Sequence, residues 1–203
     1  MATMTSTRPP VLNLPNQLTA ARFVLAVVLF VLIAVKWWGW CLGVFTAAAF
    51  TDWLDGYLAR LNNQTSALGR NLDPLVDKVL MCGTYIFLLP QGSEEGWLLP
   101  WMVTLVVGRE LIITSLRSFL ETLGARFGSD WLGKAKMGLQ CAAVIAIFVM
   151  LLKPQWPAPL GTLGTLGGWL RDGLIYTMLL ATVLSAAQYL WRATAILTTD
   201  AVR

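Results

Sequence analysis

Six apolar stretches follow one another along the chain, and each is close to the length with which a helix crosses a lipid bilayer. A span needs about 20 residues, because a helix rises about 1.5 Å per residue and the hydrocarbon core is about 30 Å thick. Backbone groups inside lipid must be bonded within the chain, which favours helices. The sequence therefore predicts an all-α membrane bundle with helices over Leu18–Val35, Cys41–Leu61, Asp73–Pro90, Leu98–Leu120, Met137–Leu152 and Gly173–Trp191.

The composition agrees with a single membrane domain. Of the 203 residues, 57% are hydrophobic and only 13% are charged, a balance typical of integral membrane proteins. We expect one domain over residues 13–192, a flexible, interfacial N-terminal tail over 1–12 and a cytoplasmic tail over 193–203. No short apolar segment with a small-residue cleavage site precedes the first span, so we expect no removable signal peptide.

The distribution of lysine and arginine predicts the orientation of the bundle. Cytoplasmic loops of membrane proteins carry more Lys and Arg than external loops. The loop over residues 62–72 and the segment that follows the fourth span are basic, whereas the loop over 91–96 is acidic and the loop over 153–172 is rich in Pro, Gly and Trp. We therefore expect both termini on the cytoplasmic side of the membrane, and the loops over 91–96 and 153–172 on the external side.

Cysteine and histidine usage excludes several kinds of chemistry. Histidine is absent, and Cys41, Cys82 and Cys141 lie in apolar surroundings at no metal-ligand spacing. Zinc sites, thiolate catalysis and histidine general bases are therefore not expected. The net charge of +4 is spread over the loop ends, which suits anionic lipid and phosphate better than nucleic acid.

Four aspartates interrupt the apolar pattern in one short region: Asp52, Asp55, Asp73 and Asp77. On a helix the first two are three residues apart and the last two are four apart, so each pair shares a helix face. Gly56 and Ala59 follow on the face of the first pair and leave it without side-chain bulk. Charged side chains in spans are costly and usually line a polar cavity or hold ions.

This region predicts a divalent metal site for a phosphorylated substrate. Mg²⁺ and Mn²⁺ prefer carboxylate oxygens and often share their ligands with substrate phosphates. Arg60 adds a fixed positive charge beside the acids. The alternative is that the acids form ordinary interfacial ion pairs with Arg60, Arg70 and Lys78. Asp73 precedes Pro74, which suits an N-cap followed by the first residue of the third helix.

A second group of charges lies on the fourth predicted span and just after it. Arg109 and Arg117 are two helical turns apart and within about 80° of each other around the helix axis. Guanidinium groups suit phosphate, so the pair predicts an anion site. Glu110 is the alternative partner for Arg109, and Lys134 and Lys136 are either part of the site or ordinary cytoplasmic residues.

The acidic region resembles the signature of the CDP-alcohol phosphotransferase family, DxxDGxxARx8GxxxDxxxD. This pattern is matched at Asp52, Asp55, Gly56, Ala59, Arg60, Gly69, Asp73 and Asp77. Eight fixed positions match by chance at on the order of 10⁻¹⁰ per starting point, given typical residue frequencies.

Three further segments are similar to the phosphatidylglycerophosphate synthase branch of that family: LPNQLTAARF, GRELIITSLRSFLETLG and LGKAKMGLQ. The branch pattern is RE followed by LR and then GKxKxxxQ, matched at Arg109, Glu110, Leu116, Arg117, Gly133, Lys134, Lys136 and Gln140. The resemblance covers residues 13–140. Met137 departs from it, because the branch often has Thr there.

The resemblance implies an activity and a role for each matching residue. The reaction would move a phosphatidyl group from CDP-diacylglycerol to sn-glycerol 3-phosphate, with CMP as the leaving group. Two Mg²⁺ or Mn²⁺ ions would be held by Asp52, Asp55, Asp73 and Asp77, with Asp77 also accepting the acceptor's proton.

CDP-diacylglycerol would contact Asp52, Gly56, Ala59, Arg60 and Gly69. Glycerol 3-phosphate would bind Arg109, Arg117 and Lys134, and further polar contacts would come from Thr19, Arg22, Lys136 and Gln140. The resemblance also implies a homodimer in the bacterial cytoplasmic (inner) membrane, with the active site facing the cytoplasm.

Three alternatives remain open at this point. A related enzyme with inositol phosphate, serine or phosphatidylglycerol as acceptor would share the acidic motif. An intramembrane prenyltransferase also uses Asp-rich motifs and Mg²⁺, but two similar motifs and a longer bundle would be expected. A cation transporter would not need the small residues Gly56 and Ala59 or the arginines. Release of CMP from CDP-diacylglycerol separates the first class from the other two.

Overall fold

The computed structural model describes residues 14–62, 67–122, 131–152 and 161–200, and these residues are helical apart from short turns. The side chains of residues 52–74 and of several positions near other helix ends fall outside this description. The helices, in chain order, are α1 (Leu14–Ala34), α2 (Trp38–Asn62), α3 (Ala67–Glu95), α4 (Pro100–Thr122), α5 (Trp131–Leu151) and α6 (Gly161–Asp200). The prediction of an all-α chain is confirmed for the described residues.

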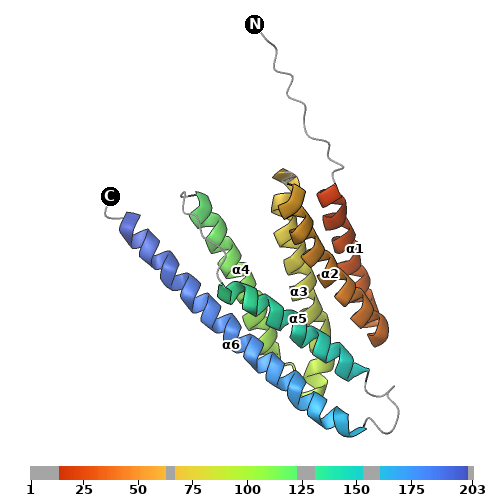
Figure 1. Cartoon of the computed structure of the whole chain (residues 1–203). Helices are drawn as coiled ribbons and strands as arrows, with labels where there is room; N and C mark the ends of the chain where they lie inside the picture. Colours follow the sequence, from red (N-terminus) through yellow and green to blue (C-terminus); the bar gives the residue numbers. More distant parts are fainter. Residues whose placement is uncertain (1–13, 63–66, 123–130, 153–160, 201–203) are drawn as a thin grey trace.

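The helices form a bundle in which successive members run in alternating directions (Figure 1). Helix α1 packs against both α2 and α3, α5 packs along α6, and α4 lies between α3 and α6. The start of α3 and the ends of α2, α4 and α6 point toward the end of the bundle at which α1 begins (Figure 1). The helical segments 52–62 and 67–78, which carry the acidic motif, therefore share one end of the molecule.

The interior is apolar where α1, α2, α3 and α5 meet. Ala26, Leu29, Phe45 and Phe148 are fully buried there, and Phe45 packs edge-on against Phe148 with ring centroids 6.0 Å apart. Gly83 on α3 lies so close to the Phe30 ring of α1 that a Cβ at this position would overlap it. A glycine is therefore required for the close approach of these two helices.

Helices α1 and α3 end in the same hydrogen-bonded turn. After α1, Trp37 N–H donates to the Leu32 carbonyl and Lys36 N–H donates to the Ile33 carbonyl, both at 3.0 Å. Lys36 adopts a φ of 58°, a left-handed conformation that is usual for glycine at this position. After α3, Gly96 occupies the equivalent position with a φ of 79°. The first turn therefore carries a strain that the second avoids.

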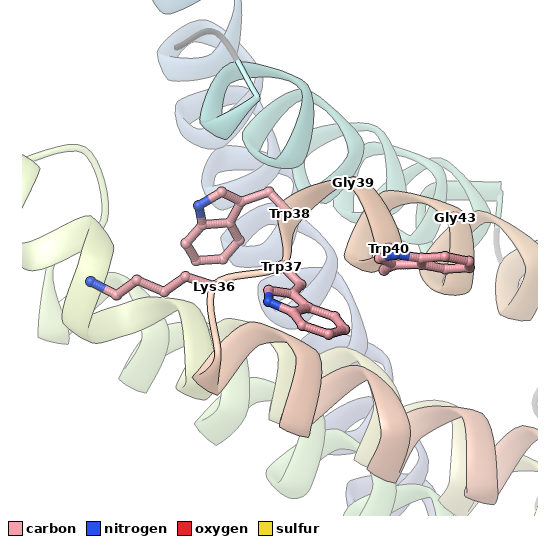
Figure 2. Close-up of a pocket in the computed structure, with 6 residues that line it drawn as sticks. All are labelled: Lys36, Trp37, Trp38, Gly39, Trp40 and Gly43. Atoms are coloured by element: carbon pink, nitrogen blue, oxygen red, sulfur yellow. The ribbon is translucent and has the colours of Figure 1, made fainter. Parts of the chain in front are cut away.

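The turn between α1 and α2 borders a hollow of about 580 Å³ (Figure 2). Lys36, Trp37, Trp38 and Trp40 line it, together with two glycines of α2. Tryptophans gather at membrane interfaces because the ring is apolar and its N–H is polar. This cluster lies at the end of the bundle opposite the acidic motif.

Several predicted helix boundaries are wrong. Helix α3 begins at Ala67, so Asp73 and Pro74 lie inside it rather than at its N-cap and first position, and residues 67–72 do not belong to a loop. Proline removes only one backbone donor, and the preceding Ala, Leu and Arg favour helix. The predicted loop over 91–96 is also helical as far as Glu95, where Gln91 Nε2 donates to Glu95 Oε1 at 2.5 Å.

The last helix is much longer than predicted. Helix α6 begins at Gly161, so residues 161–172 are not part of the expected external loop. It continues to Asp200 and so includes most of the expected C-terminal tail. The predicted N-terminal tail and the loop residues 63–66 and 153–160 lie outside the described residues.

The described helices differ in how well they match a membrane span. Gly133–Leu151 and Leu166–Ala195 are long and apolar enough to cross a bilayer, whereas Thr19–Ala34 and Trp38–Thr51 are apolar over shorter lengths. Large apolar side chains cover the outside of the bundle, among them Val24, Phe50, Ile112, Leu180 and Leu184. Such a surface is what lipid contact requires, since soluble proteins rarely expose extended apolar patches.

Candidate active site

The acidic motif occupies the end of α2 and the first half of α3. Asp52 and Asp55 lie on α2 with Gly56, Ala59 and Arg60, and Gly69, Asp73 and Asp77 lie on α3. All four acids lie in helices, as the spacing argument assumed. The side chains of all but Asp77 are outside the described part of the structure, so the predicted contacts of those residues stay predictions.

Asp77 forms an ion pair with Arg22 of α1. Arg22 Nη1 lies 2.7 Å from Asp77 Oδ1, and only 2% of the arginine side chain is exposed. A buried arginine without an anion would be very costly. The pair therefore fixes the Asp77 carboxylate between α1 and α3. Thr19, one turn before Arg22 on the same helix, is also buried.

Lys78, the residue after Asp77, connects the acidic motif to α4. Its ammonium group donates a hydrogen bond to the Thr114 hydroxyl. Thr114 in turn donates to the Glu110 backbone carbonyl, one helical turn earlier, at 2.6 Å. Two hydrogen bonds thus link Lys78, the neighbour of Asp77, to the backbone of α4 at Glu110.

Glu110 lies between two cations. Arg109 Nη1 is 3.1 Å from Glu110 Oε1, and Lys136 Nζ of α5 contacts the same oxygen. Arg109 and Glu110 are each 12% exposed, and Lys136 is 4% exposed. The sequence left the Arg109–Glu110 pairing open as an alternative, and the structure contains it. We refer to Arg109, Glu110 and Lys136 as the buried triad.

Arg109 is also held from the side of α6. Its Nη2 donates to Ser185 Oγ at 3.1 Å, and Ser185 donates to the Thr182 carbonyl at 3.0 Å. The Nε atom of Arg109 is buried without a hydrogen-bond partner, and so is Nε2 of Gln140. Gln140 lies one turn after Lys136 on α5, and its backbone carbonyl accepts a 3.1 Å hydrogen bond from Tyr85 of α3. Helices α3, α4, α5 and α6 therefore meet around the buried triad.

The other two predicted phosphate ligands lie farther out. Arg117 is 51% exposed and pairs with Glu121, which is 52% exposed, at 2.9 Å. Lys134 is exposed on the first turn of α5. In the described contacts, Arg109 is therefore linked through Glu110 to Lys136, and not to Arg117 or Lys134. Lys136, which the sequence gave only as a further contact, is the lysine that points inward.

Sequence reasoning missed three polar residues of this region. It treated Lys78 only as a possible counter-charge and did not single out Thr114 or Ser185. Thr114 lies five residues after Arg109, and Ser185 lies on a helix for which no motif was found. These residues come together through the packing of α4 against α3 and α6. In the sequence, their only indication of a role at the site was that they are polar residues in apolar helices.

The donor set is suited to a divalent metal ion. Among the side chains that the structure describes, no three acidic, histidine or cysteine residues gather to hold a metal. Three of the four motif acids are outside that set. The positions of the motif acids on two helices that share one bundle end fit hard cations, which take carboxylate oxygens. CDP-alcohol phosphatidyltransferases generally use divalent metal ions, and these positions are compatible with such ions.

Comparison with known proteins covers nearly the whole chain. The sequence model of the family described as CDP-alcohol phosphatidyltransferase matches residues 12–199. A protein of Blochmanniella floridana is 33% identical over 92% of this chain and 94% of its own length. It is named a CDP-diacylglycerol–glycerol-3-phosphate 3-phosphatidyltransferase.

Two more relatives carry the same name. The protein of Pectobacterium atrosepticum is 34% identical over 70% of this chain and 79% of its own length. That of Pseudomonas fluorescens is 36% identical over 70% of this chain and 74% of its own length. The match over residues 12–199 includes the acidic motif and all six helices except the last residue of α6, and on this basis the chain belongs to the CDP-alcohol phosphatidyltransferase family.

Proposed function

We propose that the protein transfers a phosphatidyl group from CDP-diacylglycerol to the hydroxyl of sn-glycerol 3-phosphate, giving phosphatidylglycerol phosphate and CMP. One observation in the structure carries the proposal furthest. Lys78, the residue after Asp77, donates to Thr114 of α4, and Thr114 donates to the backbone carbonyl of Glu110, the acid of the buried triad. This link between α3 and α4 supports a carboxylate region for a metal-bound diphosphate beside a basic region for a phosphorylated acceptor. The relatives named for this reaction supply the identity of the substrates.

CDP-diacylglycerol binds along α2 and the start of α3. Gly56, Ala59 and Gly69 leave room for the nucleotide against the helix backbone. Arg60 contacts the diphosphate, because a guanidinium group matches two phosphate oxygens at once. The acyl chains remain in the membrane, so this site must open sideways to lipid as well as to the cytoplasm.

Asp52, Asp55, Asp73 and Asp77 would hold two Mg²⁺ or Mn²⁺ ions. When bound, such ions neutralise the charge that develops on the departing CMP. Four acids lie close together in this motif, and unneutralised carboxylates are costly in a low-dielectric site. We expect a chelator to abolish turnover and Mg²⁺ or Mn²⁺ to restore it, and full activity in the chelator would disprove the metal requirement.

Glycerol 3-phosphate binds on the α4 and α5 side. Arg109 holds its phosphate inside the bundle, and Arg117 and Lys134 attract it at the exposed ends of these helices. Thr19, Arg22, Lys136 and Gln140, all buried, add polar contacts or hold neighbouring groups in place. Asp77, fixed by Arg22, accepts the proton of the attacking hydroxyl as the new P–O bond forms and the bond to CMP breaks.

The proposed setting is a six-span homodimer in the bacterial cytoplasmic membrane, with both termini in the cytoplasm. The apolar exterior of the bundle and the bacterial relatives support a membrane location. The motif then faces the cytoplasm, where both CMP and glycerol 3-phosphate are soluble. Water-soluble substrates reach a site at the bundle end more readily than one at the centre of the bilayer.

The test is a panel of acceptors with purified protein, CDP-diacylglycerol and a divalent cation. Release of CMP is measured with glycerol 3-phosphate, inositol phosphate, serine and phosphatidylglycerol. We expect release with glycerol 3-phosphate alone. Release with another acceptor only would keep the family chemistry and replace the acceptor, and no release with any of them would refute the proposed reaction.

A further inference from the structure

A groove lies between α1 and α3 at the end of the bundle opposite the acidic motif. Its volume of about 330 Å³ is within the usual range for ligand sites. We refer to it as the α1–α3 groove. Both helices contribute to its apolar walls, which consist of Ile33, Ala34, Ile86, Phe87 and Pro90. Phe87 is held in place by parallel stacking on Phe30 of α1, with ring centroids 4.9 Å apart.

The α1–α3 groove changes from apolar to charged along the helix axes. Lys36 and Glu94 also line it. Ile33 precedes Lys36 by about one helical turn, and Ile86 precedes Glu94 by about two. Both helices run toward this end of the bundle and stop there, so the apolar walls lie deeper than the charges. The exposed Trp37 beside the groove is a residue type that gathers at membrane interfaces. This order of apolar and charged groups matches that of a phospholipid.

The two charges of the groove are unused in the described part of the protein. Neither the Lys36 ammonium nor the Glu94 carboxylate has an ion-pair or hydrogen-bond partner among the described side chains. The adjacent Glu95, by contrast, accepts hydrogen bonds from Gln91 Nε2 at 2.5 Å and from Trp97 Nε1 at 2.8 Å. Opposite charges that line one groove without pairing with each other suit a ligand that carries both an anion and a cation.

The backbone at Lys36 gives a second, independent indication. Lys36 has a φ of 58°, whereas Gly96 occupies the equivalent position after α3. Glycine adopts this conformation without strain, so a lysine lowers stability here. Strained residues that persist often serve a site. Figure 2 shows the Lys36 side chain extended away from the three tryptophans, and its ammonium is a suitable partner for phosphate.

We propose that the α1–α3 groove binds a phospholipid with a zwitterionic head group, in which a primary ammonium is joined to the phosphate by a short carbon chain. Lys36 binds the phosphate, Glu94 accepts a hydrogen bond from the ammonium, and an acyl chain lies along the apolar walls. A glycerol head group has no cation for Glu94, and a choline head group has a cation without N–H donors. The site is separate from the acidic motif and does not depend on the reaction proposed above.

The experiment titrates the purified protein in detergent with three lipids that share the same acyl chains and carry an aminoethyl, choline or glycerol head group. Native mass spectrometry measures the fraction of protein that retains a lipid. We expect wild type to bind the aminoethyl lipid roughly 5- to 10-fold more tightly than the other two, as for one charged hydrogen bond. Free phosphoethanolamine at the same concentration should not displace this lipid, because the apolar walls supply part of the affinity.

Three substitutions assign the roles of the two charges. Glu94→Gln should bind all three lipids with similar affinity, since an amide has no charge with which to select an ammonium. Lys36→Gly should weaken the binding of all three lipids by a similar factor, because each of them carries the phosphate. Lys36→Arg keeps the cation and should retain most of the affinity.

Two controls separate lipid binding from folding and from the general loss of charge. In lipid-free detergent, Lys36→Gly should have a Tm equal to or above that of wild type, because glycine removes the strain at this position. Asp172→Asn removes a carboxylate near the same end of the bundle, where the adjacent Arg171 lies 4.9 Å from the Trp97 ring centroid. This variant should keep the preference for the aminoethyl lipid.

Three results would overturn the inference. They are equal binding of the three lipids by wild type, an unchanged preference in Glu94→Gln, and an unchanged affinity in Lys36→Gly. Displacement of the lipid by free phosphoethanolamine would also contradict it, because the site would then bind the head group alone. None of these measurements uses turnover, so a failure of the proposed reaction would leave them unchanged.

Discussion

Helix α4 carries two arginine–carboxylate pairs that have opposite environments. Arg109 and Glu110 are both 12% exposed and contact Lys136 of α5 and Ser185 of α6. Arg117 and Glu121, two turns later, are 51% and 52% exposed, and their ion pair stays within α4. Exposed pairs of this kind contribute at most about 1 kcal/mol to stability, whereas breaking a buried pair costs about 3–5 kcal/mol.

The difference shows that helical spacing alone does not decide which charges form a site. Arg109 and Arg117 lie within about 80° of each other around the axis, yet only the first is covered by neighbouring helices. Helix α6 lies beside α4 where Ser185 meets Arg109. Coverage by a neighbouring helix, and not spacing along α4, therefore separates the environment of Arg109 from that of Arg117.

The largest effect is expected at the ion pair between α1 and α3, Arg22–Asp77, because the carboxylate of this pair is proposed to take part in the reaction. Asp77→Asn keeps the size of the side chain and removes the basic oxygen. Turnover should fall by about 10²–10⁴, the usual contribution of a general base, while metal-dependent binding of CDP-diacylglycerol stays near that of wild type.

Asp52→Asn and Asp55→Asn are the matched controls, and these should weaken donor binding itself. Turnover is measured by CMP release, and donor binding is measured by titration with CDP-diacylglycerol in Mg²⁺. Near-normal turnover in Asp77→Asn, or a loss of donor binding as severe as in the controls, would return Asp77 to the role of a metal ligand or a structural residue.

The next effect is on stability and compares buried with exposed arginines. Arg22→Met leaves Asp77 without its 2.7 Å partner and should destabilise the protein by about 3–5 kcal/mol. Arg117→Met removes an exposed partner and should cost about 1 kcal/mol or less. Thermal unfolding in detergent, followed by tryptophan fluorescence, should give a much lower Tm for the first variant only. Equal Tm values would mean that burial of the pair contributes little.

A smaller effect is expected from the exposed lysine of α5. Lys134→Ala should raise the KM for glycerol 3-phosphate severalfold and change that for CDP-diacylglycerol less, because Lys134 is proposed to attract the acceptor from an exposed position. The effect should decrease at high salt, which screens exposed charges. Steady-state kinetics at two salt concentrations test this, and identical effects on both substrates would indicate a purely structural lysine.

The last prediction concerns location rather than rate. The proposed orientation puts the exposed Arg117–Glu121 pair at the cytoplasmic surface. In a protein without its three native cysteines, Thr122→Cys should react with an impermeant thiol reagent only from the inside of the membrane, and Ser93→Cys only from the outside. Both positions are exposed in the structure. Labelling of Thr122→Cys from outside would reverse the orientation.

Much of the fold could be predicted because apolar length is a strong signal for a helix, and all six helices were expected near their observed positions. The predicted starts of the third and sixth helices, Asp73 and Gly173, were wrong, because these helices begin at Ala67 and Gly161. Proline and glycine suggest loops locally, but packing continues a helix through them when neighbouring helices cover its apolar side.

The site could be predicted only where its residues follow each other at fixed spacing. The aspartates of the motif and the pair Arg109–Glu110 lie within single helices, so the sequence identifies them. The contacts Arg22–Asp77, Lys78–Thr114 and Lys136–Glu110 join residues of different helices. Such contacts depend on how the helices rotate and pack, which a single sequence does not specify.

Helix α6, which bonds Arg109 through Ser185, is longer than the membrane is thick. Its apolar segment, Leu166–Ala195, has 30 residues and is about 45 Å long, although the hydrocarbon core is about 30 Å thick. To match that thickness the segment would need a tilt of roughly 48°, more than the usual range, or a locally thicker bilayer. Ser185 lies within this segment and bonds Arg109, so a change in the tilt of α6 would move one of the groups that hold Arg109 in place.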